Sequence, residues 1–198
     1  MDDEKDVISP DTQRSERVPP GQRLTDDLPV LQHGGIHKVN ISKWTFDITG
    51  LVERERILSF QQFNALPKTR LLADVHCVTG WSKLGTNWEG VKTSVLKNLV
   101  TILPEARYVL VHGAGDFTTN LPLDEFFADD AIFAIEYEGK PIAPEHGYPV
   151  RLVVPRLYFW KSAKWVTGVQ FLSEDTQGFW ESRGYHNHAD PWNEERYG

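Results

Sequence analysis

The sequence predicts a single α+β domain in which short strands outnumber short helices. The chain has 198 residues, which is long enough for one well-buried domain and short for two. Its 40% hydrophobic and 25% charged residues are ordinary for a globular protein. Strand-like segments recur without long helical crossovers between them, which favours an α+β arrangement over a wound α/β one. We therefore expect one domain over residues 24–198, preceded by a flexible N-terminal arm over residues 1–23.

The first half of the chain supports this prediction element by element. Residues 1–23 are polar, charged and proline-containing, and they show no periodicity, which is typical of a mobile or surface-draped arm. Apolar alternation, capping patterns and glycine turns then mark out local structure. The expected elements are a turn at 33–35, a strand over 44–50, a short helix opening at 59–62, and a strand from Leu71 that ends near Thr79 and Gly80.

The second half predicts further strands separated by turns. We expect Thr93 to cap a helix over 94–100, which Pro104 ends. The segments 107–112, 131–137, 150–154 and 165–172 are expected strands, while 85–90 and 112–116 are expected loops, 123–128 a short helix or turn, and 138–139 a tight turn. The tail from Gly178 is rich in aromatic residues and histidine and has no period.

Charge and hydropathy exclude several classes of function. The formal net charge of −7 does not favour a nucleic-acid-binding face, which usually shows a basic patch. The longest apolar runs fall far short of the roughly 20 residues that span a bilayer, so no membrane span is expected. The N-terminus is acidic and shows no apolar signal-peptide core, and one unpaired cysteine suits a reducing compartment. We therefore expect a cytoplasmic protein.

Cys77 is the only cysteine, and it lies where an apolar strand ends. A lone thiol forms no intramolecular disulfide and cannot belong to a multi-cysteine zinc site. Three readings stay open: an inert buried thiol, a nucleophile, or a single thiolate ligand to a metal. Judged from the residue alone, the inert buried thiol is the commonest of the three.

Two later segments place cationic side chains beside apolar strands. One runs from His146 to Arg151, and the other from Lys161 to Lys164. Arginine offers a planar fork to phosphate and lysine a compact charge, so both segments suit a phosphorylated ligand, although solvated strand ends are the usual alternative. The glycine-rich loop 112–116 matches no dinucleotide or P-loop fingerprint. His186, His188 and Asp190 are weak evidence for a metal site.

Four segments, taken in order, resemble the sulfite oxidase family. They are Asp74–Lys83, Trp88–Val91, His146–Pro155 and Ser162–Trp165. The chain is most similar to the short sulfite-oxidase-like molybdopterin-binding oxidoreductases, which are related to the catalytic subunit of the molybdenum-containing methionine sulfoxide reductase. The resemblance covers about residues 28–195. It implies mixed β-sheets with short helices, a molybdenum–molybdopterin (Mo-pyranopterin) cofactor and an oxidoreductase activity.

The resemblance also implies roles for individual residues. Cys77 stands where the family's cysteine binds molybdenum, and a soft thiolate suits a metal already held by dithiolene sulfurs. Tyr185 stands at the position of an active-site tyrosine, and Trp81 is expected to help shape the substrate site. The implied cofactor-binding residues are His146 and Arg151 at the pyranopterin and Ser162, Ala163 and Lys164 at its phosphate.

The chain departs from sulfite oxidases where these bind their anionic substrate. The arginine expected after the cysteine is absent from the segment Gly80–Lys83, and a second one would fall near Thr25, close to Arg23. We therefore expect oxygen-atom transfer on a small S-oxide or N-oxide. The alternatives are sulfite oxidation with the same cofactor, a thiol enzyme that uses Cys77 with His76 or another histidine as base, and a cofactor-free binding module. No haem or flavin motif is present, which implies a separate electron-transfer protein.

Overall fold

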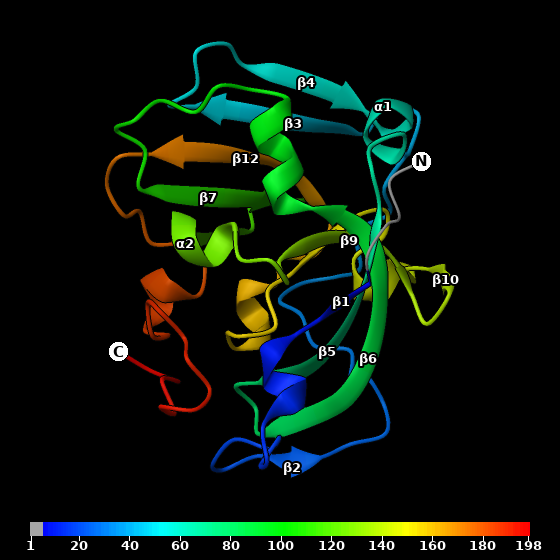
Figure 1. The fold of residues 1–198 in the computed structure, drawn as a ribbon, viewed down its shortest axis with the longest axis vertical. Helices are drawn as coiled ribbons and strands as arrows, with labels where there is room; N and C mark the ends of the chain where they lie inside the picture. Colours follow the sequence, from blue (N-terminus) through cyan, green and yellow to red (C-terminus); the bar gives the residue numbers. More distant parts are fainter. Residues whose placement is uncertain (1–5) are drawn as a thin grey trace.

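The computed structural model describes residues 6–198 and has two β-sheets (Figure 1). One sheet has the strand order β1-β5-β6-β9-β10, with β11 paired to β9 and β2 to β6. Its strands are β1 (Val7–Ile8), β2 (Arg23–Leu24), β5 (Thr69–Cys77), β6 (Trp81–Lys92), β9 (Ile132–Tyr137), β10 (Lys140–Pro141) and β11 (Arg151–Val153). We call it sheet A.

The second sheet, sheet B, has the order β4-β3-β12-β7-β8. Its strands are β3 (Thr45–Gly50), β4 (Arg56–Ser59), β7 (Tyr108–Gly113), β8 (Thr118–Pro122) and β12 (Val166–Leu172). The helices are α1 (Phe60–Asn64), α2 (Leu123–Phe126) and the 3₁₀ helices η1 (Pro10–Gln13), η2 (Thr93–Asn98), η3 (Pro144–His146), η4 (Phe159–Lys161) and η5 (Glu181–Arg183). The predicted α+β class, with mixed sheets and short helices, is confirmed.

The main hydrophobic core is built from residues of both sheets. Phe46 and Ile48 of β3 and Phe171 of β12 come from sheet B, whereas Phe133 of β9 comes from sheet A, and all four are fully buried. The rings of Phe46 and Phe133 meet edge to face at 5.0 Å between centroids. This shared core joins the two sheets and thereby fixes the loops that lie between them.

The antiparallel pair β5–β6 positions Cys77 at the end of sheet A. Cys77 pairs with Trp81 across a tight turn, in which the Gly80 amide donates to the Cys77 carbonyl at 2.9 Å. The predicted loop over 85–90 is wrong, because β6 runs unbroken through it. Gly85, at φ +65°, lies in a bulge of β6 opposite β5. A Cβ on Gly90 would lie 2.1 Å from the Phe133 carbonyl oxygen of β9. The glycines that suggested a loop thus serve a bulge and a close strand contact.

Local capping signals gave one correct and one wrong prediction. Ser59 caps α1 through the predicted capping box, with reciprocal bonds to Gln62. Thr93 is not a helix cap, because its hydroxyl donates to the carbonyl oxygens of Phe126 and Ala131, and residues 93–98 form a 3₁₀ helix. The predicted strands over 44–50, 107–112, 131–137, 150–154 and 165–172 correspond to β3, β7, β9, β11 and β12.

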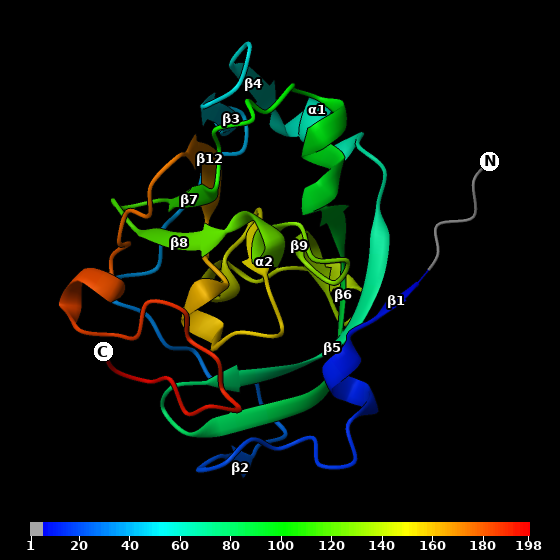
Figure 2. The same cartoon turned by 60° about the vertical axis from the view of Figure 1, so that its left-hand side comes forward.

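The described part of the N-terminal segment lies along the surface of sheet A, and the division into an arm over 1–23 and a domain over 24–198 stays a prediction. β1 pairs with β5 and β2 pairs with β6, both in parallel (Figure 2). The Arg17 guanidinium donates two hydrogen bonds to the fully buried Asp74 carboxylate, at 2.6 and 2.9 Å, and the Ser9 hydroxyl donates to Asp130 at 2.7 Å. These are single polar contacts to distant residues, so they leave no periodicity in the sequence. The part of that prediction on residues 1–5 lies outside the described residues.

Across residues 6–198, no helix has the length and apolar character needed to cross a membrane.

Candidate active site

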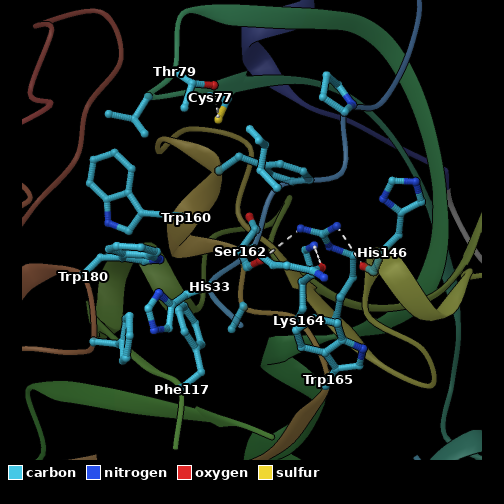
Figure 3. Close-up of a pocket in the computed structure, with 18 of the residues that line it drawn as sticks. His33, Cys77, Thr79, Phe117, His146, Trp160, Ser162, Lys164, Trp165 and Trp180 are labelled. Atoms are coloured by element: carbon cyan, nitrogen blue, oxygen red, sulfur yellow. Dashed lines mark hydrogen bonds between the residues drawn. The ribbon is translucent and has the colours of Figure 1, made fainter. Parts of the chain in front are cut away.

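A pocket of about 280 Å³ lies where the end of β5 faces loops from both sheets (Figure 3). Its walls come from the segment 29–37, the β5–β6 turn, the loop after β7, the segment from η3 to β11, η4 with the residues after it, and the segment 179–185. The structure brings together all eight residues to which the resemblance gave a role, since the lining includes Cys77, Trp81, His146, Arg151, Ser162, Ala163, Lys164 and Tyr185. Their roles stay predictions.

Cys77 is 8% exposed and faces this pocket at the end of β5. The Thr79 hydroxyl donates a hydrogen bond to its Sγ at 3.2 Å. Burial raises the pKa of the Cys77 thiol, while the Thr79 bond and the charge of Arg196 oppose that rise. A buried thiol with a raised pKa is a poor free nucleophile, because the thiolate is the reactive form.

His76 does not act as a base for Cys77. Neighbouring side chains on a strand point to opposite faces, and His76 is fully buried outside the pocket lining, with Nδ1 2.8 Å from the Ser82 hydroxyl. Burial lowers the pKa of His76 to about 4. The version of the thiol-enzyme alternative that relies on His76 is therefore not supported by the geometry.

The buried Arg151 and the half-buried Lys164 form a cationic wall on one side of the pocket. The Arg151 guanidinium donates to the carbonyl oxygens of His146 and Ser162, each at 3.0 Å, and lies over the Phe159 ring at 4.2 Å. The Lys164 ammonium donates to the Glu145 carbonyl at 2.7 Å. Burial lowers the pKa of Arg151 to about 9 and, together with the Arg151 charge, lowers the pKa of Lys164 to about 7.

These cations are held by neutral oxygens. Within residues 6–198, neither Arg151 nor Lys164 forms an ion pair with a carboxylate, and the pocket lining contains no aspartate or glutamate. Burial and these two positive charges also lower the pKa of His146. Because an uncompensated buried charge is costly, this wall favours an anionic ligand.

Two polar groups in this pocket have a hydrogen bond left to donate to a ligand. The Trp81 indole nitrogen is buried and finds no partner in the described part of the chain. The Ser162 hydroxyl accepts from the Val154 amide at 3.0 Å, which leaves its own proton available. A single thiol, the cations Arg151 and Lys164 and the free proton of the Ser162 hydroxyl therefore fit a phosphorylated cofactor whose metal takes one protein ligand, while the Trp81 N–H is left for a second ligand in the pocket.

The opposite side of the pocket is aromatic. Figure 3 shows Trp160, Trp180, His33 and Phe117 on one side of Cys77, and His146 and Lys164 on the other. Tyr185 meets the Trp160 ring edge to face at 5.1 Å. Sequence reasoning missed His33 and Phe117 as pocket residues. The only signal was the pair of glycines that follow His33, and no pattern in the sequence marked Phe117.

Several residues considered as substrate or metal ligands lie elsewhere. The Lys83 ammonium donates to the Asp26 carbonyl at 2.6 Å, and Arg23 lies exposed on β2. Neither belongs to the pocket lining. His188 contacts Glu195 at 2.8 Å, but in residues 6–198 no cluster of His, Cys, Asp and Glu is arranged to hold a metal ion.

The fold and the pocket fit a class of oxidoreductase that holds an anionic, metal-bearing cofactor. The chain belongs to the family described as "Oxidoreductase molybdopterin binding domain", which matches residues 33–180. The resemblance seen in the sequence is confirmed, and the protein is a molybdopterin-dependent oxidoreductase whose cofactor is molybdenum–molybdopterin.

Similar proteins differ in how much of their length this chain covers. The "Uncharacterized oxidoreductase YuiH" of Bacillus subtilis is 44% identical over 185 residues, which is 93% of each chain. The "Protein-methionine-sulfoxide reductase catalytic subunit MsrP" of Campylobacter jejuni is 30% identical, and the match covers 72% of this chain and 54% of MsrP. The crystal structure of the sulfane dehydrogenase SoxCD from Paracoccus pantotrophus matches with a TM-score of 0.66 at 24% identity, over 72% of this chain and 41% of that one.

We expect Lys164 to make retention of the cofactor depend on pH. A phosphate binds the charged ammonium, and the ligand-free lysine loses its proton above about pH 7, so affinity should fall as the pH rises through 7 to 8.5. The expected loss approaches roughly tenfold per pH unit. Molybdenum and pterin content after dialysis at pH 6.5, 7.5 and 8.5 measures it. In the Lys164→Arg variant, which keeps the positive charge, the retained molybdenum and pterin should not change with pH over this range. If that variant lost cofactor with pH as steeply as the unchanged protein, the titrating group would be another one.

Proposed function

We propose that the protein reduces a small organic S-oxide or N-oxide by oxygen-atom transfer at its molybdenum cofactor. The observation that carries this proposal is the distribution of charge around Cys77: the cations lie on one side and the other side is aromatic. The overall reaction for an S-oxide is R₂SO + 2e⁻ + 2H⁺ → R₂S + H₂O. The cofactor supplies the two-electron chemistry, and the protein supplies binding, orientation and electrostatics.

The proposal gives each predicted site residue a task. Cys77 is the protein ligand to molybdenum. His146 and Arg151 contact the pyranopterin, while Ser162, Ala163 and Lys164 hold its phosphate. These assignments are supported by the cations that lack carboxylate partners and by the free proton of the Ser162 hydroxyl.

Tyr185 and Trp81 are assigned to the substrate. Burial raises the pKa of the Tyr185 hydroxyl, so the group stays protonated at neutral pH and can donate to the substrate oxygen. Trp81 lines the same pocket with an indole N–H that has no other acceptor in the described part of the chain. Both residues therefore favour an acceptor oxygen on the substrate.

Sulfite is the less suitable substrate for this pocket. A compact anion needs concentrated positive charge in a partly dry site, and Arg151 and Lys164 are already assigned to the cofactor. Lys83 and Arg23 are directed elsewhere, as described above. Electrons are expected from a separate electron-transfer protein, and the cytoplasmic compartment stays a prediction.

Steady-state assays on molybdenum-loaded protein test the proposal. With a reduced viologen as electron donor for the oxides and ferricyanide as electron acceptor for sulfite, we expect kcat/KM for methionine sulfoxide or trimethylamine oxide to exceed kcat/KM for sulfite oxidation by at least about tenfold, which corresponds to roughly 1.4 kcal/mol. A sulfite value well above those for the oxides would overturn the proposal. Molybdenum analysis, expected to give about one metal per chain, separates this function from a metal-free thiol enzyme or binding module.

A further inference from the structure

The aromatic side of the pocket identifies the kind of oxide that the protein accepts. We propose that its substrate is an uncharged aryl sulfoxide or heteroaromatic N-oxide, whose ring packs against Phe117, Phe179 and Trp180. This inference rests on the proposed oxide reduction and adds the substrate class to it.

The aromatic wall has ring surface available for a ligand. Phe117, Phe179, Trp180 and Tyr185 are each only partly buried, although all four line the pocket. Neighbouring rings in this wall lie close together: Phe117 and Phe179 at 5.7 Å, Phe179 and Trp180 at 5.1 Å, Trp180 and Tyr185 at 4.9 Å. A planar ring entering here would find edge-to-face or offset partners at the usual centroid separations of about 4.5–7 Å.

Polar contacts to residues outside the pocket lining hold the aromatic side chains in place. The Trp160 indole nitrogen donates to Glu181 at 3.1 Å, and Glu181 pairs with the buried Lys161 at 2.7 Å. On the outer side, the Arg183 guanidinium lies 3.6 Å from the centre of the Phe179 ring and donates to the Phe179 carbonyl at 2.7 Å. A wall with fixed ring positions favours a rigid flat ligand over a flexible chain, because little further ordering is needed on binding.

Charge excludes a cation as the preferred occupant. Aromatic walls also bind quaternary ammonium groups, but such sites attract a positive charge. This pocket is lined by Arg151, Lys164 and His146, and by no carboxylate. Even with an anionic cofactor that neutralises part of this charge, the lining gives a cation only the faces of the aromatic rings and no carboxylate to pair with. A neutral aryl oxide suits this pocket, because its ring is apolar like the aromatic side and carries no positive charge for Arg151 and Lys164 to repel.

The first test measures binding without catalysis. Quenching of tryptophan fluorescence in the cofactor-loaded protein gives Kd for methyl phenyl sulfide, cyclohexyl methyl sulfide and tetramethylammonium chloride. The first two probes have similar size and differ in the aromatic ring. We expect the phenyl compound to bind at least about threefold more tightly than the cyclohexyl compound and more tightly than the cation. Equal or tighter binding of the cyclohexyl compound or of the cation would overturn the inference.

The second test uses turnover and a matched pair of variants. We expect kcat/KM for methyl phenyl sulfoxide to exceed that for dimethyl sulfoxide by at least about tenfold, and Phe179→Leu to reduce this ratio at least about threefold. Phe127→Leu is the control: Phe127 stacks on Phe171 outside the pocket, and its loss should leave the ratio unchanged. If Phe179→Leu fails to fold, Phe117→Leu replaces it.

The outcomes separate this inference from the proposed function. Tighter binding of the phenyl probe without reduction of any oxide would leave the aromatic site standing and overturn oxide reduction. Two outcomes would leave oxide reduction standing and overturn the aromatic substrate class. In the first, methyl phenyl sulfoxide is reduced no better than dimethyl sulfoxide. In the second, Phe179→Leu and Phe127→Leu change the ratio of the two kcat/KM values equally.

Discussion

Cys77→Ala is expected to reduce turnover by more than about a hundredfold while the protein still folds. Loss of a residue that only supports a metal ligand costs roughly 10–100-fold, and loss of the ligand itself should cost more. The substitution removes one buried sulfur atom, so the free energy of unfolding should fall by only about 1 kcal/mol. Oxide reduction, molybdenum content and urea unfolding measure the three effects.

Thr79→Val is the matched comparison for Cys77→Ala. It removes only the hydroxyl that donates to Sγ at 3.2 Å and keeps the side chain's size. We expect a loss within the 10–100-fold range, with molybdenum retained and a shifted electron paramagnetic resonance signal of the metal. Full activity in a Cys77→Ala protein that still contains molybdenum would show that Cys77 is not the ligand.

Lys161→Met is expected to lower the free energy of unfolding by about 3–5 kcal/mol. Lys161 and Glu181 are both fully buried, with Nζ and Oε1 2.7 Å apart. Lys161 also donates to the Asn120 carbonyl at 2.9 Å, and Glu181 accepts from Thr119 and Trp160. Removing the lysine leaves a buried carboxylate without its cation, which is far more costly than losing an exposed ion pair.

A double variant tests this explanation. In Lys161→Met/Glu181→Leu neither charge remains, and much of the lost stability should return, because apolar replacements for a buried pair are often neutral. Urea unfolding at constant cofactor occupancy measures all three proteins. If Lys161→Met changed the free energy of unfolding by less than about 1 kcal/mol, or if the double variant were less stable than the single one, the pair would not hold η4 and η5 together.

Short-range patterns predicted those parts of the fold whose stabilising contacts are local. Apolar alternation identified β3, and Ser59 with Gln62 identified the start of α1, because period and capping are properties of a few consecutive residues. The prediction failed at β6, where Gly85 and Gly90 suggested a loop. Their roles depend on β5 and β9, which lie elsewhere in the chain and leave no mark near the glycines.

The candidate site, too, was predictable from the sequence only in part. Composition and spacing left Cys77 with three readings, and only the resemblance of four ordered segments assigned it, together with His146, Arg151 and Lys164, to a molybdenum cofactor. The family match confirms the cofactor and the oxidoreductase class. The individual roles of these residues stay predictions, and the variants above test them for Cys77 and Lys164.

The sequence was sufficient for the α+β class, the single cysteine at a strand end and the segments that carry the cationic residues. The three-dimensional packing was needed to show that Arg17 neutralises Asp74, 57 residues away, and that His33, Phe117, Trp160 and Trp180 line one side of the same pocket. The reason is physical: strand period and helix caps arise between near neighbours, whereas pocket walls and buried ion pairs form between residues that only the folded chain brings together.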